Sequence, residues 1–171
     1  MSAVRIYLPA TLPGLTAAGV GSDKPASQIE VAAAGARACA VTPALREWYR
    51  EGDLDELEYA AMTRAALASL RLLAQGGGDR RVVLAADVAD DAVVFDQGDD
   101  PAAVRVLASV HFDQVVSAHV DDSSAAIDVV AAGAQVEAAD LGDDDAQFVI
   151  EGLEDHELQW YAVQEIASLL R

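Results

Sequence analysis

Residues 53–75 have the sequence DLDELEYAAMTRAALASLRLLAQ and predict the long helix around which the fold is built. Asp53 can accept hydrogen bonds from the amides of the first turn, and Glu56 follows three residues later, as in a capping box. At 100° per residue the apolar side chains fill two stripes, and only the arc around Glu56, Arg64 and Arg71 is polar. We therefore expect one helix here, buried over most of its girth.

Glycines end this helix, and a strand follows. Gly76-Gly77-Gly78 could form a phosphate-binding loop, but such loops follow a strand and open a helix, whereas this one follows a helix. A helix terminator and linker is the better interpretation. Residues 82–86, Val-Val-Leu-Ala-Ala, are continuously apolar, which is typical of a central strand covered on both faces.

Further strands are predicted where apolar residues alternate or run together over strand length. These stretches are residues 4–8, 38–41, 104–108 and 115–120, with shorter candidates at 93–95 and 148–150. The connection between 104–108 and 115–120 is too short for a helical crossover, so these two strands pair antiparallel if they are neighbours. We expect a mixed sheet of four to five strands.

Capping residues predict the remaining helices. Thr11 and Thr42 each precede a proline-containing first turn, and the cluster Asp121-Asp122-Ser123-Ser124 precedes a helix that ends near Gly133. From Glu154 onward, apolar residues at helical spacing predict a C-terminal helix. At 171 residues the chain is long enough for one core. The expected fold is therefore a single α/β domain over residues 1–171, with a mixed sheet packed against the long central helix and the C-terminal helix.

Charge and cysteine content limit the function classes. The formal net charge is −18, which disfavours nucleic acid, because a phosphate backbone requires clustered cations. The lone Cys39 excludes an internal disulfide, and no secretory leader or apolar run of membrane-spanning length is present. We expect a cytoplasmic protein that does not enter a membrane.

Acidic residues follow two of the predicted strands and are the first candidates for chemistry. Asp87 follows one strand, and Asp121 and Asp122 follow another. If these carboxylates converge they could bind Mg²⁺ and act in catalysis, with His156 as a general base or further ligand. The alternative is that each aspartate caps a helix or turn. Outside this Mg²⁺ hypothesis the sequence predicts no cofactor.

The acidic stretch near the C-terminus supports a structural hypothesis. Asp143-Asp144-Asp145 lacks the ligand spacing of a calcium loop and is interpreted as a solvated loop or as charge complementing the N-terminus of the next helix. On the expected C-terminal helix, Gln159 falls on the apolar side and needs hydrogen-bond partners. We predict that Gln159 holds residues 140–145 in place and leaves His156 half-exposed at the edge of any pocket.

Several stretches together carry a resemblance to a known family. They are residues 4–12, 40–49, 55–61 and 139–161. Over most of its length the chain resembles a family of uncharacterised actinobacterial proteins of about this size. The resemblance implies no activity, cofactor or catalytic residue.

No catalytic spacing of the hydrolase, dinucleotide or P-loop type is present. The pairs Trp48-Tyr49 and Trp160-Tyr161 suit interfaces, although core anchoring is the alternative. The preferred hypothesis is a non-enzymatic binding or regulatory module that contacts a protein partner or forms a homodimer. The alternative is a metal-assisted hydrolase or phosphotransfer enzyme that uses Asp87, Asp121 and Asp122, with His156.

Overall fold

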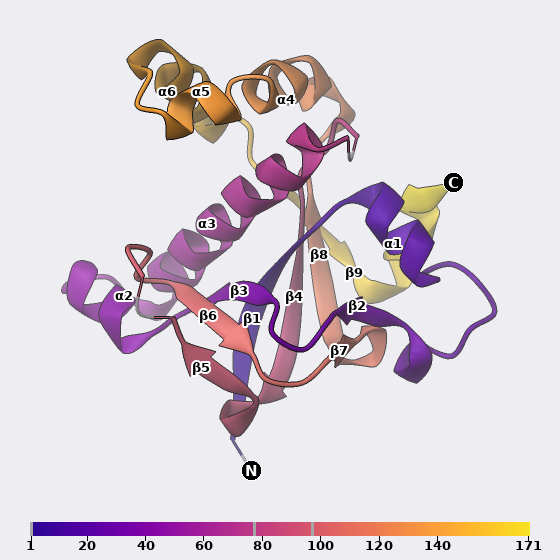
Figure 1. The fold of residues 1–171 in the computed structure, drawn as a ribbon. Helices are drawn as coiled ribbons and strands as arrows, with labels where there is room; N and C mark the ends of the chain where they lie inside the picture. Colours follow the sequence, from indigo (N-terminus) through magenta and orange to yellow (C-terminus); the bar gives the residue numbers. More distant parts are fainter. Residues whose placement is uncertain (1, 77, 97) are drawn as a thin grey trace.

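The computed structural model describes residues 2–76, 78–96 and 98–171. At its centre is a seven-stranded sheet with the order β5-β6-β3-β1-β4-β8-β9, and all described pairings in it are antiparallel (Figure 1). The strands are β1 (Ala3–Ala10), β3 (Arg37–Ala40), β4 (Val82–Ala89), β5 (Val93–Phe95), β6 (Ala103–Val106), β8 (Val115–Val120) and β9 (Gln159–Ala162). A second sheet pairs β2 (Glu30–Ala32) with β7 (Val110–His111). The prediction of a mixed sheet of four to five strands is wrong in both number and direction.

The long antiparallel pair β1–β4 forms the middle of the sheet, with Ile6 opposite Ala86. Residues 82–86 are buried on both faces, as their continuous apolar run predicted. The strands predicted at 93–95 and at the four longer stretches are also present. The predicted strands 104–108 and 115–120 are not neighbours, because β6 pairs with β3 and β5 while β8 pairs with β4 and β9.

One face of the sheet is covered by α3 (Leu54–Ala74) and by the short α2 (Pro43–Trp48). The Asp53 carboxylate accepts a hydrogen bond from the Glu56 amide at 2.9 Å, so the predicted cap is confirmed. Gly76 adopts a φ of +103° just after the helix, a conformation that favours glycine. Gly77 of the predicted terminator lies outside the described residues. The buried contacts of this face join Leu57, Ala61 and Ala65 to Tyr7, Val83 and Ala85.

The opposite face is covered by α1 (Leu12–Ala18), the small sheet and the 3-10 helix η6 (Val163–Leu170). The Thr11 hydroxyl accepts from the Gly14 amide at 3.0 Å and caps α1 as predicted. Ile166 of η6 is fully buried against this face. The other 3-10 turns are η1 (Ala26–Gln28), η2 (Asp90–Ala92), η3 (Phe112–Gln114), η4 (Ser123–Ala125) and η5 (Gly152–Asp155).

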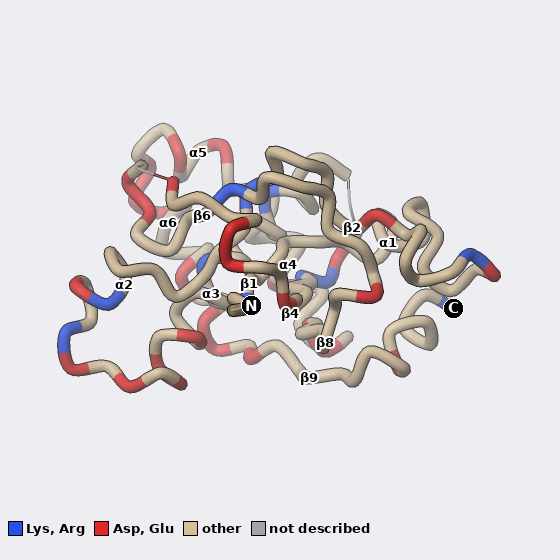
Figure 2. The backbone as a smooth tube through the Cα atoms, turned by 90° about the horizontal axis from the view of Figure 1, so that it is seen from below, with Lys and Arg blue, Asp and Glu red and all other residues tan. Residues whose placement is uncertain are grey.

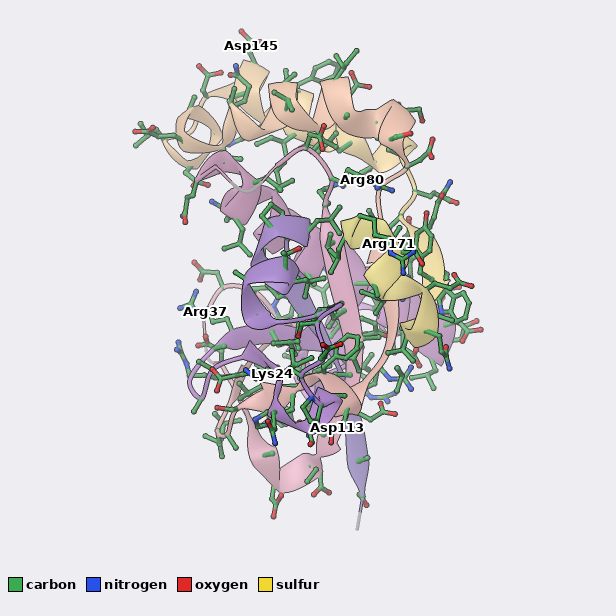
Figure 3. All side chains as sticks on the ribbon, turned by 90° about the vertical axis from the view of Figure 1, so that its right-hand side faces the viewer. Lys24, Arg37, Arg80, Asp113, Asp145 and Arg171 are labelled. Atoms are coloured by element: carbon green, nitrogen blue, oxygen red, sulfur yellow. The ribbon has the colours of Figure 1, made fainter. Side chains whose placement is uncertain are left out.

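Three short helices form a separate layer over the C-terminal end of α3, with Asp145 pointing outward from it and Arg80 at its junction with the sheet (Figure 3). They are α4 (Ala126–Gly133), α5 (Val136–Asp140) and α6 (Asp144–Glu151). The Asp143 carboxylate caps α6 through the Ala146 amide at 2.9 Å, so the acidic cluster does complement a helix N-terminus. Residues 148–150 lie within α6, and the strand predicted there is wrong.

The predicted C-terminal helix is also wrong. From Gly152 the chain forms η5, then β9, then η6, because residues 159–162 pair with β8 and their Trp and Tyr favour strands. Gln159 is consequently exposed, and its side chain accepts from the Tyr161 hydroxyl at 3.3 Å. It does not hold the acidic segment. That segment is tied down by an ion pair between Arg71 and Asp140.

None of the helices in the described part of the chain has both the length and the apolar character needed to cross a membrane.

Candidate functional site

A groove of about 860 Å³ runs along α3, and its other wall is formed by residues 150–158, which lead from α6 down to β9. We call it the α3 groove. At one end Tyr49 contributes from the end of α2, and at the other end Arg81 contributes from the start of β4. The groove therefore extends from the N-terminal turn of α3 to the helical layer.

The lining of the α3 groove is mainly apolar. Tyr59, Met62, Ala66 and Leu70 follow one another at intervals of three or four residues, which places them on one side of α3. Leu153 and Leu158 face them from the opposite wall. Tyr59 is exposed, so the groove offers an aromatic surface as well as aliphatic ones.

Carboxylates surround this apolar lining. Glu56 comes from the first turn of α3, and Glu151, Glu154 and Glu157 come from the opposite wall. All four are exposed. None of them forms an ion pair within residues 2–76, 78–96 and 98–171.

The two arginines and the histidine that reach the groove are already paired. Arg64 binds Asp100 at 3.1 Å, and Arg81 binds Asp121 at 2.8 Å. His156 places Nε2 at 2.7 Å from Asp128 Oδ2. The four glutamates therefore set the charge that a ligand would encounter.

The excess of negative charge around the groove continues through residues 106–170, since they contain no Lys or Arg. Figure 2 shows the distribution on the fold: the helical layer and the segment that leads into β9 carry acidic residues but no basic ones. The whole second wall of the groove belongs to this region, so its surroundings are negative as well.

Asp121, one of the predicted site residues, forms a buried ion pair that anchors this wall. Its carboxylate accepts from Arg81 Nε and Nη2 at 2.8 Å each and from the Arg81 backbone amide at 2.8 Å. The same Arg81 Nη2 donates to the backbone carbonyl of His156 at 3.1 Å. Asp121 thus holds Arg81, which in turn holds the segment that carries His156.

Asp87 lies at the opposite end of the sheet. It accepts from Arg5 Nε at 2.6 Å and from Arg5 Nη2 at 3.1 Å on the neighbouring strand β1. A strand rise of about 3.3 Å per residue puts Asp87 about 20 Å from Arg81 along β4. Because β4 and β8 run antiparallel, their carboxyl ends point in opposite directions, and the structure does not bring Asp87 together with Asp121.

Asp122 is next to Asp121 in the chain but has a different role. Its carboxylate accepts from the Ser124 hydroxyl at 2.5 Å and from the Ser124 amide at 3.3 Å, and so caps η4. The bond from the Ser124 hydroxyl, followed by that from the amide, lowers the pKa of Asp122. Within the described residues no group of three His, Cys, Asp or Glu side chains is arranged to hold a metal ion.

Only His156 of the four candidates lines the α3 groove. Its side chain is half-buried, in the position predicted for it at a pocket edge. The sequence did not predict the groove wall around His156, because the pattern of residues 154–162 predicts a helix. A usable signal was the sequence Gln159-Trp160-Tyr161, since adjacent aromatic residues favour a strand.

The predicted aromatic pairs are mostly exposed. Trp48, Tyr49 and Trp160 are exposed, so the alternative of core anchoring does not apply to them, whereas Tyr161 packs partly against the core.

Comparison with known proteins identifies the family of the chain. A family model described as a family of unknown function (DUF6912) matches residues 4–170. No curated protein and no solved structure matches the chain.

Proposed function

We propose that this chain, which belongs to the family of unknown function DUF6912, is a binding module that holds an apolar, positively charged segment of a partner protein in the α3 groove. One observation carries the proposal: the groove has an apolar lining and four exposed glutamates, while Arg64, Arg81 and His156 beside it are paired with aspartates. Its volume of about 860 Å³ lies within the range of binding clefts.

An amphipathic helix is the form of partner that best fits this geometry. Helix-in-groove recognition lays the apolar face of a helix into a hydrophobic groove, and the α3 groove follows the length of a helix that could pack beside it. Lys and Arg at the edges of such a helix would meet Glu56, Glu154 and Glu157. Complementary charges of this kind accelerate association and select against acidic partners.

The outer helical layer gives independent support for protein contacts. Ile127, Leu141 and Phe148 are 84%, 84% and 76% exposed. Where such side chains form a contiguous patch, they mark an interaction surface. The metal-assisted enzyme hypothesis receives less support, because Asp87 lies far from Asp121 and both are engaged by arginines.

A pair of synthetic peptides tests the proposal. One is a leucine- and lysine-based amphipathic helix of about 18 residues, long enough to cover most of α3, and the other has glutamate in place of lysine. Fluorescence anisotropy with labelled peptides should show binding of the basic peptide that weakens as salt is added, and no binding of the acidic one.

Two double variants locate the binding site. The double variant Glu154→Lys with Glu157→Lys should lower the affinity for the basic peptide by about tenfold, since two exposed ion pairs of about 0.7 kcal/mol each are lost. Asp90→Lys with Asp91→Lys makes the same change of charge in η2, outside the groove, and should have a much smaller effect. Equal weakening by both variants would show that net charge, and not the groove, attracts the peptide.

A further inference from the structure

The seven-stranded sheet ends in an open edge at β9. Among the described residues β9 pairs only with β8, so the backbone groups on its outer side have no strand partner. All four of its residues are exposed or half-buried. An unpaired edge of this kind is a template for pairing with another chain.

Edge strands are usually protected by charges, proline or a bulge, and β9 has none of these. Its residues are Gln, Trp, Tyr and Ala, and its register with β8 is unbroken. The other edge of the sheet, β5, differs. Asp96 directly follows β5 and lies 3.6 Å from both Arg37 and Arg105, so that edge is bordered by a charged cluster.

Trp160 gives the β9 edge a side chain suited to recognition. It is 61% exposed and lies opposite His119 on β8. A flat aromatic ring in this position can pack against an aliphatic side chain of an added strand, since aromatic and β-branched pairs stabilise adjacent strands.

We propose that β9 accepts an extended segment of a partner protein as an eighth strand of the sheet. Backbone hydrogen bonds to β9 supply affinity, and contact with Trp160 supplies selectivity. The segment carries β-branched residues at its centre and Lys or Arg at its ends, because Glu157 precedes β9 and Glu165 follows it. Apart from Glu157, which also borders the α3 groove, the site uses none of the groove residues, and it does not depend on the function proposed there.

A second copy of the chain is a poor occupant. Antiparallel pairing of two β9 strands would bring Glu157 of one copy close to Glu165 of the other, and like charges across strands are destabilising. Residues 106–170 offer no Lys or Arg to offset this repulsion. The occupant is therefore a basic segment of a different protein.

Fluorescence of Trp160 tests the proposal directly. Trp48 is the other tryptophan of the chain and is exposed on α2, so Trp48→Phe leaves Trp160 as the single reporter. The probe is the peptide Lys-Thr-Val-Thr-Val-Lys, titrated to millimolar concentration. Its control has the same side chains with alternate amides N-methylated, which blocks strand pairing. A third peptide replaces both lysines with glutamate.

The expected result is a saturable blue shift of Trp160 emission with the first peptide and at least tenfold weaker binding of the other two. Equal binding of the N-methylated peptide would overturn the proposal, because contact would then not involve the backbone. Absence of any shift at millimolar peptide, or a shift that appears on concentrating the protein alone, would also overturn it. None of these outcomes bears on the groove, which is tested with helical peptides and glutamate variants.

Discussion

Two arginine–aspartate pairs occupy opposite ends of β4 and differ chiefly in exposure. The side chains of Arg81 and Asp121 are 9% and 0% exposed, whereas those of Arg5 and Asp87 are 42% and 41% exposed. Both pairs have two side-chain hydrogen bonds. The chemistry is the same at the two ends, and the surroundings decide what each pair does.

The buried pair connects three parts of the molecule, while the exposed pair connects two adjacent strands. Asp121 joins the end of β8 to the start of β4 through the Arg81 backbone and side chain, and Arg81 adds the groove wall through the His156 carbonyl. Arg5 and Asp87 link strands that the ladder already holds together. An aspartate that follows an apolar strand can therefore serve as a buried structural anchor.

The largest effect is expected from Asp121→Ala. This variant leaves the Arg81 guanidinium buried without its partner, which should lower the free energy of unfolding by about 3–5 kcal/mol. The midpoint of a urea or guanidinium titration measures the change. The segment around His156 should also become less ordered. Faster amide hydrogen exchange over residues 150–158 would show this.

A double variant is the control for that prediction. Arg81→Met with Asp121→Leu removes both charges. It should lower the free energy of unfolding by less than Asp121→Ala alone does, because no unpaired charge stays buried. If the double variant is as unstable as the single one, the cost comes from lost packing and backbone bonding, and our account of the buried pair is wrong.

A smaller effect is expected from Asp87→Ala. The exposed pair is screened by solvent, so its loss should change the free energy of unfolding by about 1 kcal/mol or less. The same denaturant titration applies, repeated at high salt, where the difference from wild type should shrink further. A loss comparable to that of Asp121→Ala would remove the distinction between the two pairs.

The smallest effect concerns His119, whose pKa is lowered by desolvation and then by the positive charge of Arg5. Arg5→Met should raise the pKa of His119 without restoring its ordinary value, because desolvation remains. An NMR titration of the His119 ring measures this shift. An unchanged pKa would mean that Arg5 does not act on His119.

The same shift predicts a pH dependence of stability. A histidine with a lowered pKa in the folded state binds protons more readily when the chain is unfolded. Its contribution is present above the unfolded pKa of about 6.5 and is lost as the pH falls below that value. Raising the folded pKa with Arg5→Met should therefore make the loss of stability between pH 7 and pH 5 less steep than in wild type.

Local patterns predicted the elements whose signals lie within a few residues. The cap at Asp53, the caps at Thr11 and Thr42, and the apolar run at 82–86 each depend on short-range chemistry, and each is confirmed. The strand order could not be predicted in this way, because β1 pairs with β3 and β4 through contacts that no local window contains.

The errors at the C-terminus have a physical cause. Leu158, Ala162 and Ile166 repeat at helical spacing, but in the structure they belong to the groove wall, to β9 and to η6. The pairing of β9 with β8 outweighs that weak helical pattern. For the candidate site, the sequence placed His156 at a pocket edge for the wrong reason, and it gave no sign that Arg81 would neutralise Asp121.

The position of β1 has a consequence for synthesis of the protein on the ribosome. β1 is made well before its partner β4, which lies far along the chain, so Ile6 cannot pair with Ala86 until that residue has left the exit tunnel. β8 and then β9 add outward from β4, each later than the one before. Because loops of this length must close before the pairing stabilises them, we expect folding on a timescale of about milliseconds to seconds rather than microseconds. Until β4 emerges, Ile6 and Leu8 lack their partners on that strand, although both belong to the finished core.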